Sequence, residues 1–142
     1  MTIDTNITPE FLNSNFNSKM TQLLGIEYTE VGKDYLCAKM PVDDRTKQPM
    51  GLLHGGASVV LAESIGSVAS NLIVHHEGKQ CVGLEVNANH LKSARDGFVY
   101  GKATAVHIGK KTHIWDIRIN NEQGELVCIS RLTVAILDKK KA

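Results

Sequence analysis

The apolar stretch from His54 to Val74 constrains the fold of this chain more than any other feature. It is rich in aliphatic and small residues and is too long for one strand, so it predicts a single long helix. The helix is apolar on almost every side, which predicts burial on most faces. His75, His76 and Gly78 mark its end, because cationic side chains and glycine favour helix C-termini.

The same stretch is long enough to cross a bilayer at helical rise. However, it contains Glu63, Asn71 and several serines and glycines, and this polarity argues against a lipid-facing helix. The N-terminus lacks a basic region followed by an apolar one. The sequence therefore predicts neither a transmembrane span nor a signal peptide.

After Gly78 the sequence alternates with a period of two, which predicts antiparallel strands. Turns are expected at residues 94–97, 109–111 and 120–124. One strand face is expected to carry Val82, Leu84, Val86, Ala88 and His90.

Two further strands are expected before the long helix, at residues 26–31 and 35–42. Short helices are expected to begin at Thr8-Pro9 and to span residues 18–24. Small residues on the long helix and on one strand allow close approach of the two backbones. The predicted fold class is α+β, with a long central helix wrapped by a curved antiparallel sheet.

Length and composition indicate one soluble domain over residues 1–142, with an N-terminal extension at 1–18 and a tail at 139–142. The chain has 142 residues, 42% of them hydrophobic and 22% charged, and a net charge of +1. This charge balance argues against nucleic acid or an anionic membrane as a partner. The basic tail is expected to be solvated, with nucleic-acid contact as the alternative.

Cys37, Cys81 and Cys128 are widely spaced and lie in apolar runs, without a metal-ligand pattern. We expect buried, reduced thiols in a cytoplasmic protein and no metal site. The adjacent His75 and His76 offer a metal-binding alternative, but neighbouring helix residues point in different directions.

Glu63 is the residue that fits its surroundings least, because it is the only charged residue between His54 and His75. A carboxylate within an apolar helix loses hydration and has no cationic partner on its own helix. This predicts a pocket carboxylate suited to general-base or nucleophilic work. The alternatives are an ion pair with a distant arginine and exposure at an interface.

His54-Gly55-Gly56 opens the same helix, where free N–H groups and the positive end of the helix dipole favour a developing oxyanion. The alternative is that these glycines serve only packing. Gly55 and Glu63 lie about 12 Å apart along the helix axis. This is too far for both to act on one carbonyl, so the hypothesis is a site shared between two subunits.

Three other residues have a functional and a structural interpretation of equal weight. Ser67 follows Glu63 by one helical turn and either orients the carboxylate or bonds its own backbone. Gln48 either polarises a carbonyl or is an ordinary loop residue. His90 either binds a ligand or is a core histidine.

Two segments around these residues resemble the hot-dog-fold acyl-CoA thioesterases. They are residues 48–58, which read QPMGLLHGGAS, and residues 61–64, which read LAES. Residues 83–95 and 109–115 match the same branch, that of 4-hydroxybenzoyl-CoA thioesterase with a helix-borne glutamate. Within it, the chain is similar to 1,4-dihydroxy-2-naphthoyl-CoA hydrolases and enterobactin proofreading thioesterases.

The resemblance implies hydrolysis of an acyl-CoA without a cofactor, by homodimers that pair into homotetramers. It implies that Glu63 is the nucleophile or general base and that the Gly55 N–H of the partner subunit receives the thioester oxygen. Gln48, His54 and Ser67 support the substrate or the attacking water. Residues implied to bind coenzyme A are Val82, Asn89, His90, Leu91, Lys92, Ser93, Arg95, His107, Ile108, Gly109, Lys110, Lys111 and Thr112.

Lys92, Arg95, Lys110 and Lys111 are expected to lie at neighbouring strand ends and to meet the phosphates. The acyl group, aromatic or medium-chain, is expected against Ser64, Val68, Asn71 and Leu72. Two other functions fit the residues less well. They are a hot-dog dehydratase, for which His54 and Glu63 would supply the histidine and the acid, and a non-catalytic acyl-CoA-binding module.

Overall fold

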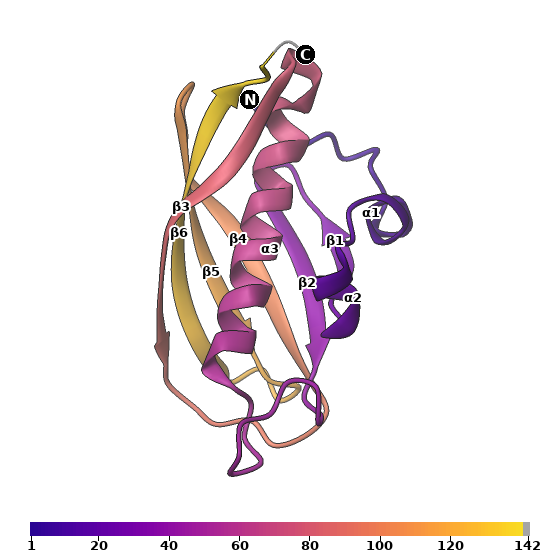
Figure 1. The fold of residues 1–142 in the computed structure, drawn as a ribbon, viewed down its shortest axis with the longest axis vertical. Helices are drawn as coiled ribbons and strands as arrows, with labels where there is room; N and C mark the ends of the chain where they lie inside the picture. The colour runs from indigo at the N-terminus through magenta and orange to yellow at the C-terminus, as the bar shows by residue number, and fades with distance from the viewer. Residues whose placement is uncertain (141–142) are drawn as a thin grey trace.

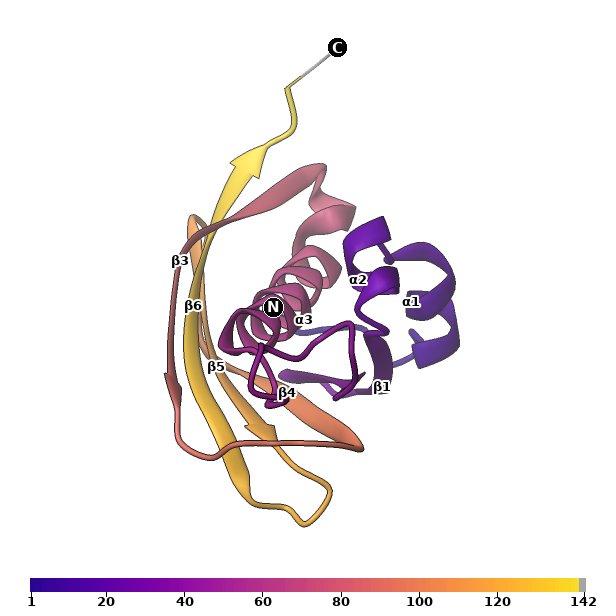
Figure 2. The ribbon, with the colours of Figure 1, turned by 60° about the horizontal axis from the view of Figure 1, so that its bottom comes forward.

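The computed structural model describes residues 1–140, so the predicted tail at 139–142 lies partly outside the described residues. Six strands form one antiparallel sheet in the order β1-β2-β4-β5-β6-β3. The sheet curls around the long helix α3, as Figure 1 and Figure 2 show, which confirms the α+β prediction. The elements are α1 (Pro9–Asn15), α2 (Lys19–Leu23), β1 (Glu27–Val31), β2 (Tyr35–Pro41), α3 (Gly55–Val74), η1 (His75–Glu77), β3 (Lys79–His90), β4 (Phe98–Ile108), β5 (Thr112–Asn120) and β6 (Leu126–Asp138).

The predicted long helix is present and is bounded by the expected residues. His54 is its N-cap, and Gly78 ends the following 3-10 turn with φ of 69°. Among residues 1–140, this is the one helix long and apolar enough to cross a membrane, and 61% of its apolar window is buried within the protein. The burial follows from the sheet that covers it.

Small residues bring α3 close to the sheet, as expected. A Cβ at Gly101 of β4 would lie 2.7 Å from Ile65 Cδ1, and a Cβ at Gly66 of α3 would lie 2.6 Å from Leu132 Cδ2. Because these glycines have no side chain, Ile65 fills the space beside Gly101 and Leu132 fills the space beside Gly66. Contact at this range gives the interior its density.

The two short N-terminal helices are present, and α1 begins at its predicted cap, Thr8. Thr8 Oγ1 accepts a hydrogen bond from the N–H of Phe11, and Ser18 Oγ accepts one from the N–H of Thr21. The segment expected as an N-terminal extension packs onto the core, because Ile3 and Leu12 are both buried. α1 and α2 lie beside β1, at the opposite edge of the sheet from β3 (Figure 2).

The alternation predicted for β3 is wrong in its first half, because the strand contains a β-bulge. Consecutive β6 residues oppose Gly83 and Glu85, so Leu84 has no pairing partner on β6. The extra residue reverses which side chains face the helix. As a result Cys81 and Gly83 contact α3, whereas Val82 and Leu84 are exposed.

A buried polar cluster joins α3 to β5. Trp115 Nε1 donates to Ser70 Oγ at 2.8 Å, and His113 Nδ1 lies 3.0 Å from the same oxygen. All three residues are buried, and His113 Nε2 has no hydrogen-bond partner within the described part of the chain. Burial lowers the pKa of His113 and favours its neutral form.

The three cysteines are free thiols, but the burial predicted for all of them is complete only at Cys128. Cys128 is buried, and Cys37 and Cys81 are half-buried. Burial raises the pKa of Cys37 to about 11, so this thiol stays protonated near neutral pH.

Candidate active site

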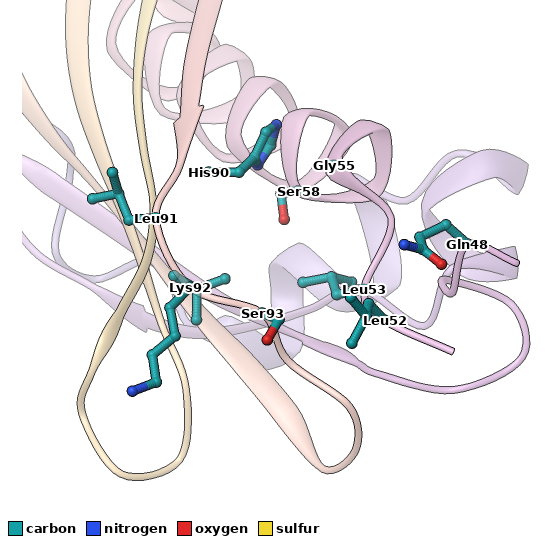
Figure 3. Close-up of a pocket in the computed structure, with 10 residues that line it drawn as sticks. Gln48, Leu52, Leu53, Gly55, Ser58, His90, Leu91, Lys92 and Ser93 are labelled. Carbon is teal, nitrogen blue, oxygen red and sulfur yellow. The ribbon is translucent and has the colours of Figure 1, made fainter. Parts of the chain in front are cut away.

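A hollow of about 330 Å³ opens beside the first turn of α3. It lies between the loop that precedes the helix and the segment that follows β3, and Figure 3 shows the side chains around it. The lining residues are Gln48, Leu52, Leu53, Gly55, Ser58, His90, Leu91, Lys92, Ser93 and Val127. The hollow therefore brings together two of the predicted catalytic residues and four of the predicted coenzyme A ligands.

The Gly55 N–H is the free amide at the start of α3. The next three amides are occupied, because Gly56 N donates to His54 Nδ1 at 2.8 Å and the N–H groups of Ala57 and Ser58 donate to the His54 carbonyl. Within residues 1–140, the Gly55 N–H has no such acceptor. It lies at the positive end of the helix dipole and is available to an oxygen of a ligand.

Gln48 presents its amide nitrogen to the same hollow. The loop is a tight turn in which Gln48 N donates to the Leu52 carbonyl at 2.8 Å, and Gln48 Oε1 accepts from the N–H of Met50. The amide NH2 group is therefore the end of the side chain left for a ligand, and it points toward the hollow in Figure 3. A donor in this position can polarise a carbonyl group.

Glu63 is not part of this hollow. It lies two turns along α3, half-buried, with its carboxylate against Gly83 of β3. No basic side chain forms an ion pair with it among the residues that the structure describes. Glu63 thus lies beside the edge strand, at the free edge of the sheet.

His54 and Ser67, the other two predicted catalytic residues, do not line the hollow either. The His54 ring caps the helix through Nδ1, a role that the sequence analysis did not assign to it. With Nδ1 acting as an acceptor, Nε2 carries the proton of the neutral ring. Ser67 follows Glu63 by one turn, and its backbone carbonyl accepts a bond from Cys81 Sγ of β3 at 3.4 Å.

Lys92 is already paired with a carboxylate. Its Nζ forms a short ion pair with Glu125 in the β5–β6 turn, and Asn121 Nδ2 donates to the same carboxylate. The Lys92 ammonium holds the pKa of Glu125 below its ordinary value, with help from Asn121. A phosphate that binds Lys92 competes with Glu125, which the sequence analysis did not identify.

The basic residues predicted at neighbouring strand ends lie at opposite ends of the sheet. Lys92 and Arg95 follow the end of β3, whereas Lys110 and Lys111 lie in the turn before β5. Across the ladder, Thr112 aligns with Val82 near the start of β3. From Val82 to His90 is about 25 Å along the strand, so one chain cannot bring both groups to one phosphate cluster.

Three other residues that were expected to contact the substrate do not line the hollow. The Asn89 side chain faces away from α3 and lines a separate hollow with Asn87 and Asp116 on the outer face of the sheet. Val82 is exposed beside the free edge, and Leu72 is buried in the core. The wrong expectation for Leu72 arose because apolar positions occur all around α3.

Some lining residues were missed by the sequence analysis. Ser58 follows Gly55 by three residues, and this helical spacing was the available signal. Leu52, Leu53 and Val127 had no comparable signal, because apolar residues in a loop and a strand resemble ordinary core residues. Within residues 1–140, no group of three or more His, Cys, Asp or Glu side chains comes together to hold a metal ion.

Comparison with known proteins connects this geometry to a family. Residues 50–128 match the family described as thioesterase superfamily. The chain is 56% identical over 131 residues to 1,4-dihydroxy-2-naphthoyl-CoA hydrolase of Escherichia coli, covering 92% of this chain and 96% of that protein. It is 45% identical to the proofreading thioesterase EntH of Cronobacter turicensis, covering 92% and 95% of the two chains.

Solved structures agree with the fold. A mutant of thioesterase PA1618 from Pseudomonas aeruginosa superposes with a TM-score of 0.91 and 50% identity, covering 95% of this chain and 97% of that chain. Thioesterase HI1161 from Haemophilus influenzae superposes with a TM-score of 0.92 and 44% identity, covering 99% and 98%. The predicted hot-dog fold is confirmed, and this chain belongs to the thioesterase superfamily, as a thioester hydrolase.

Proposed function

We propose that this protein hydrolyses acyl-CoA thioesters at a site shared by two copies of the chain. The observation that carries the proposal is the separation of Glu63 from the hollow that contains Gly55 and Gln48. One chain offers a carboxylate without an oxyanion donor and, elsewhere, an oxyanion donor without a carboxylate. A second copy supplies what each half lacks.

The free edge of β3 is where the second copy would join. β3 has 12 residues and forms one edge of the sheet, with Val82 46% and Leu84 61% exposed beside it. A long exposed edge is a template for pairing with another strand. Antiparallel pairing of β3 with its own copy continues the sheet and makes a two-fold dimer.

The contacts of α3 indicate which register unites the two halves. Glu63 lies against Gly83, and Gly55 lies against His90. Because the bulge shortens the first half of β3 by one spacing, pairing centred on Val86 sets Val82 opposite Asn89 of the partner subunit, next to the partner's His90. The partner's Gly55 then lies near Glu63, and the two basic segments at opposite ends of one sheet meet across the dimer. The proposed homodimer, and a homotetramer built from two of them, rest on this arrangement.

The proposed reaction places the thioester carbonyl on the Gly55 N–H and the Gln48 amide. As a general base, Glu63 takes a proton from water, and the water oxygen bonds to the carbonyl carbon. The C–S bond then breaks, and the leaving thiolate takes the proton. As a nucleophile, Glu63 first displaces the thiolate to form a mixed anhydride, which water opens. Both routes yield a carboxylic acid and free coenzyme A.

The proposed substrate is an aromatic or medium-chain acyl-CoA, with 1,4-dihydroxy-2-naphthoyl-CoA as the first candidate. This candidate is supported by the 56% identity to the Escherichia coli enzyme of that name. Ser64 and Val68 are half-buried on α3, and the proposal places the acyl group against them. No cofactor takes part in the proposed reaction.

The test measures thiol release from 1,4-dihydroxy-2-naphthoyl-CoA, benzoyl-CoA and a medium-chain acyl-CoA. We expect wild-type turnover of at least one substrate and a fall in kcat of at least about 100-fold in Glu63→Gln. Glu10→Gln, an exposed glutamate in α1, is the matched control and should retain full activity. Tight binding without thiol release by the wild type would instead favour a binding module.

Oxygen-18 water distinguishes the two routes in a single turnover. Label that enters the Glu63 carboxylate supports the anhydride, since only attack of water on the Glu63 carbonyl of that intermediate puts it there. Label confined to the product acid fits direct activation of water, or an anhydride that water opens only at the acyl carbonyl. Mass spectrometry of the peptide that contains Glu63 reads the outcome.

A further inference from the structure

We infer that Gly83, at the β-bulge of β3, is a positioning residue for the Glu63 carboxylate. This inference rests on the proposed function, because it concerns the group assigned there as base or nucleophile. Gly83 contributes no functional group of its own. Its role follows from the space that an absent side chain leaves.

The contact between the two residues is closer than any side chain at position 83 allows. A Cβ on Gly83 would overlap Glu63 Oε1, and it would lie 3.3 Å from Cδ and 3.9 Å from Cγ. The carboxylate oxygen would have to move by on the order of 1 Å to reach ordinary van der Waals contact. Gly83 has no positive φ, so its backbone conformation does not itself require glycine.

The β-bulge explains why a glycine faces the helix at this point. If the strand alternated regularly from Val86 back to Gly83, position 83 would point away from α3. The bulge instead directs position 83 toward Glu63 and leaves the adjacent Cys81 thiol against the Ser67 carbonyl. The backbone of Gly83 therefore faces the Glu63 carboxylate, and the small Cys81 side chain faces the next turn of α3.

Gly83→Ala should therefore impair the reaction much more than the fold. The atoms that must move are at the far end of a flexible side chain, so stability changes little. A catalytic group displaced by about 1 Å can cost on the order of 100-fold in rate. We expect kcat for Gly83→Ala to fall by about 10- to 100-fold, while KM changes less than about threefold.

The decisive comparison is the effect of Gly83→Ala in a protein that also carries Glu63→Asp. Aspartate is one methylene shorter, so its carboxylate no longer reaches the added methyl group. We expect Gly83→Ala to reduce kcat by less than about threefold in this background, which makes the two substitutions strongly non-additive. Equal losses in both backgrounds would overturn the inference, as would a Gly83→Ala variant with wild-type kcat.

Gly32→Ala is the matched control. Its added Cβ would overlap the Tyr35 ring in the β1–β2 turn, at the other edge of the sheet from β3. It imposes a steric conflict on the Tyr35 ring, which contacts Glu30 and Lys102 rather than Glu63. We expect kcat within about twofold of wild type. A fall equal to that of Gly83→Ala would show that any such conflict reduces activity.

A second readout does not depend on turnover. Carbodiimide coupling of an amine to Glu63, followed by peptide mass spectrometry, reports access to the carboxylate. We expect Gly83→Ala to change the labelling rate of Glu63 severalfold and leave that of Glu10 unchanged. An unchanged Glu63 rate overturns the inference even if the wild type fails to release thiol, a failure that would count against the proposed function alone.

Discussion

The His90 imidazole lies against the first residue of α3, so that a Cβ at Gly55 would come within 2.7 Å of Nε2. The end of β3 and the start of α3 therefore meet at a position where only hydrogen fits. This contact places the last residue of the edge strand beside the free Gly55 N–H. It couples the proposed oxyanion donor to the strand that would form the dimer.

Gly55→Ala is expected to lower kcat/KM by at least about tenfold, because the methyl group must displace either the imidazole or the helix start. Thiol release measures the loss. His90→Ala removes the ring and should relieve the conflict, so the double variant should lose less than the sum of the single losses. Strictly additive losses would contradict a direct contact.

Mixing two inactive variants tests whether the site is shared. Glu63→Ala and Gln48→Ala should each reduce turnover, since each removes one half of the proposed site. After joint refolding, a heterodimer contains one doubly altered site and one intact site. Random pairing should then restore about a quarter of wild-type activity. Mixtures that stay as inactive as their components would show that each chain builds its own site.

Glu125→Gln should strengthen the interaction of Lys92 with an anionic substrate. With the competing carboxylate neutralised, we expect KM for acyl-CoA to fall about two- to fivefold at low salt and the difference to shrink as salt rises. Glu122→Gln is the control, because this carboxylate lies in the same turn and accepts a bond from Phe98 N instead. Equal effects of the two substitutions would point to net charge rather than to release of Lys92.

Ser70→Ala should destabilise the fold by about 2 kcal/mol, because it leaves the buried Trp115 Nε1 donor without an acceptor. Urea unfolding followed by tryptophan fluorescence measures the free energy of unfolding. Ser14→Ala, an exposed serine in α1, should change it by less than about 0.5 kcal/mol. A loss below about 0.5 kcal/mol in Ser70→Ala would mean that another acceptor replaces Ser70.

Stability should fall as the solution becomes acidic, through His113. Burial lowers the pKa of the folded imidazole, while the unfolded chain titrates near the ordinary value of about 6.5. Below that value the unfolded state binds more protons, so the free energy of unfolding decreases by up to about 1.4 kcal/mol per pH unit until the folded pKa is passed.

The His113→Asn variant should have a lower free energy of unfolding than the wild type at about pH 7.5. This free energy should change less with pH between about pH 5 and 7, the range around the ordinary histidine pKa. His76→Asn, at an exposed histidine, should keep the wild-type slope. Unfolding curves across this pH range check both variants. A wild-type slope in His113→Asn would assign the acid sensitivity to other groups.

The sequence by itself determined the secondary structure and the elements of the chemistry. Length and periodicity separated helix from strand, and capping residues such as Thr8 and Gly78 marked the ends, because these signals are local. The isolated charge of Glu63 and the glycines before it were visible for the same reason. The resemblance then named the fold that the comparisons support.

Only the tertiary structure decided how these parts combine. The bulge at Leu84 reversed one half of β3, and alternation alone does not reveal an inserted residue. The register of the strand ladder placed Lys92 and Lys110 at opposite ends of the sheet, and the strand order left β3 at its edge. The contacts of Gly83 with Glu63 and of Gly55 with His90 join residues far apart in sequence. Such contacts depend on chain topology, which local patterns do not encode.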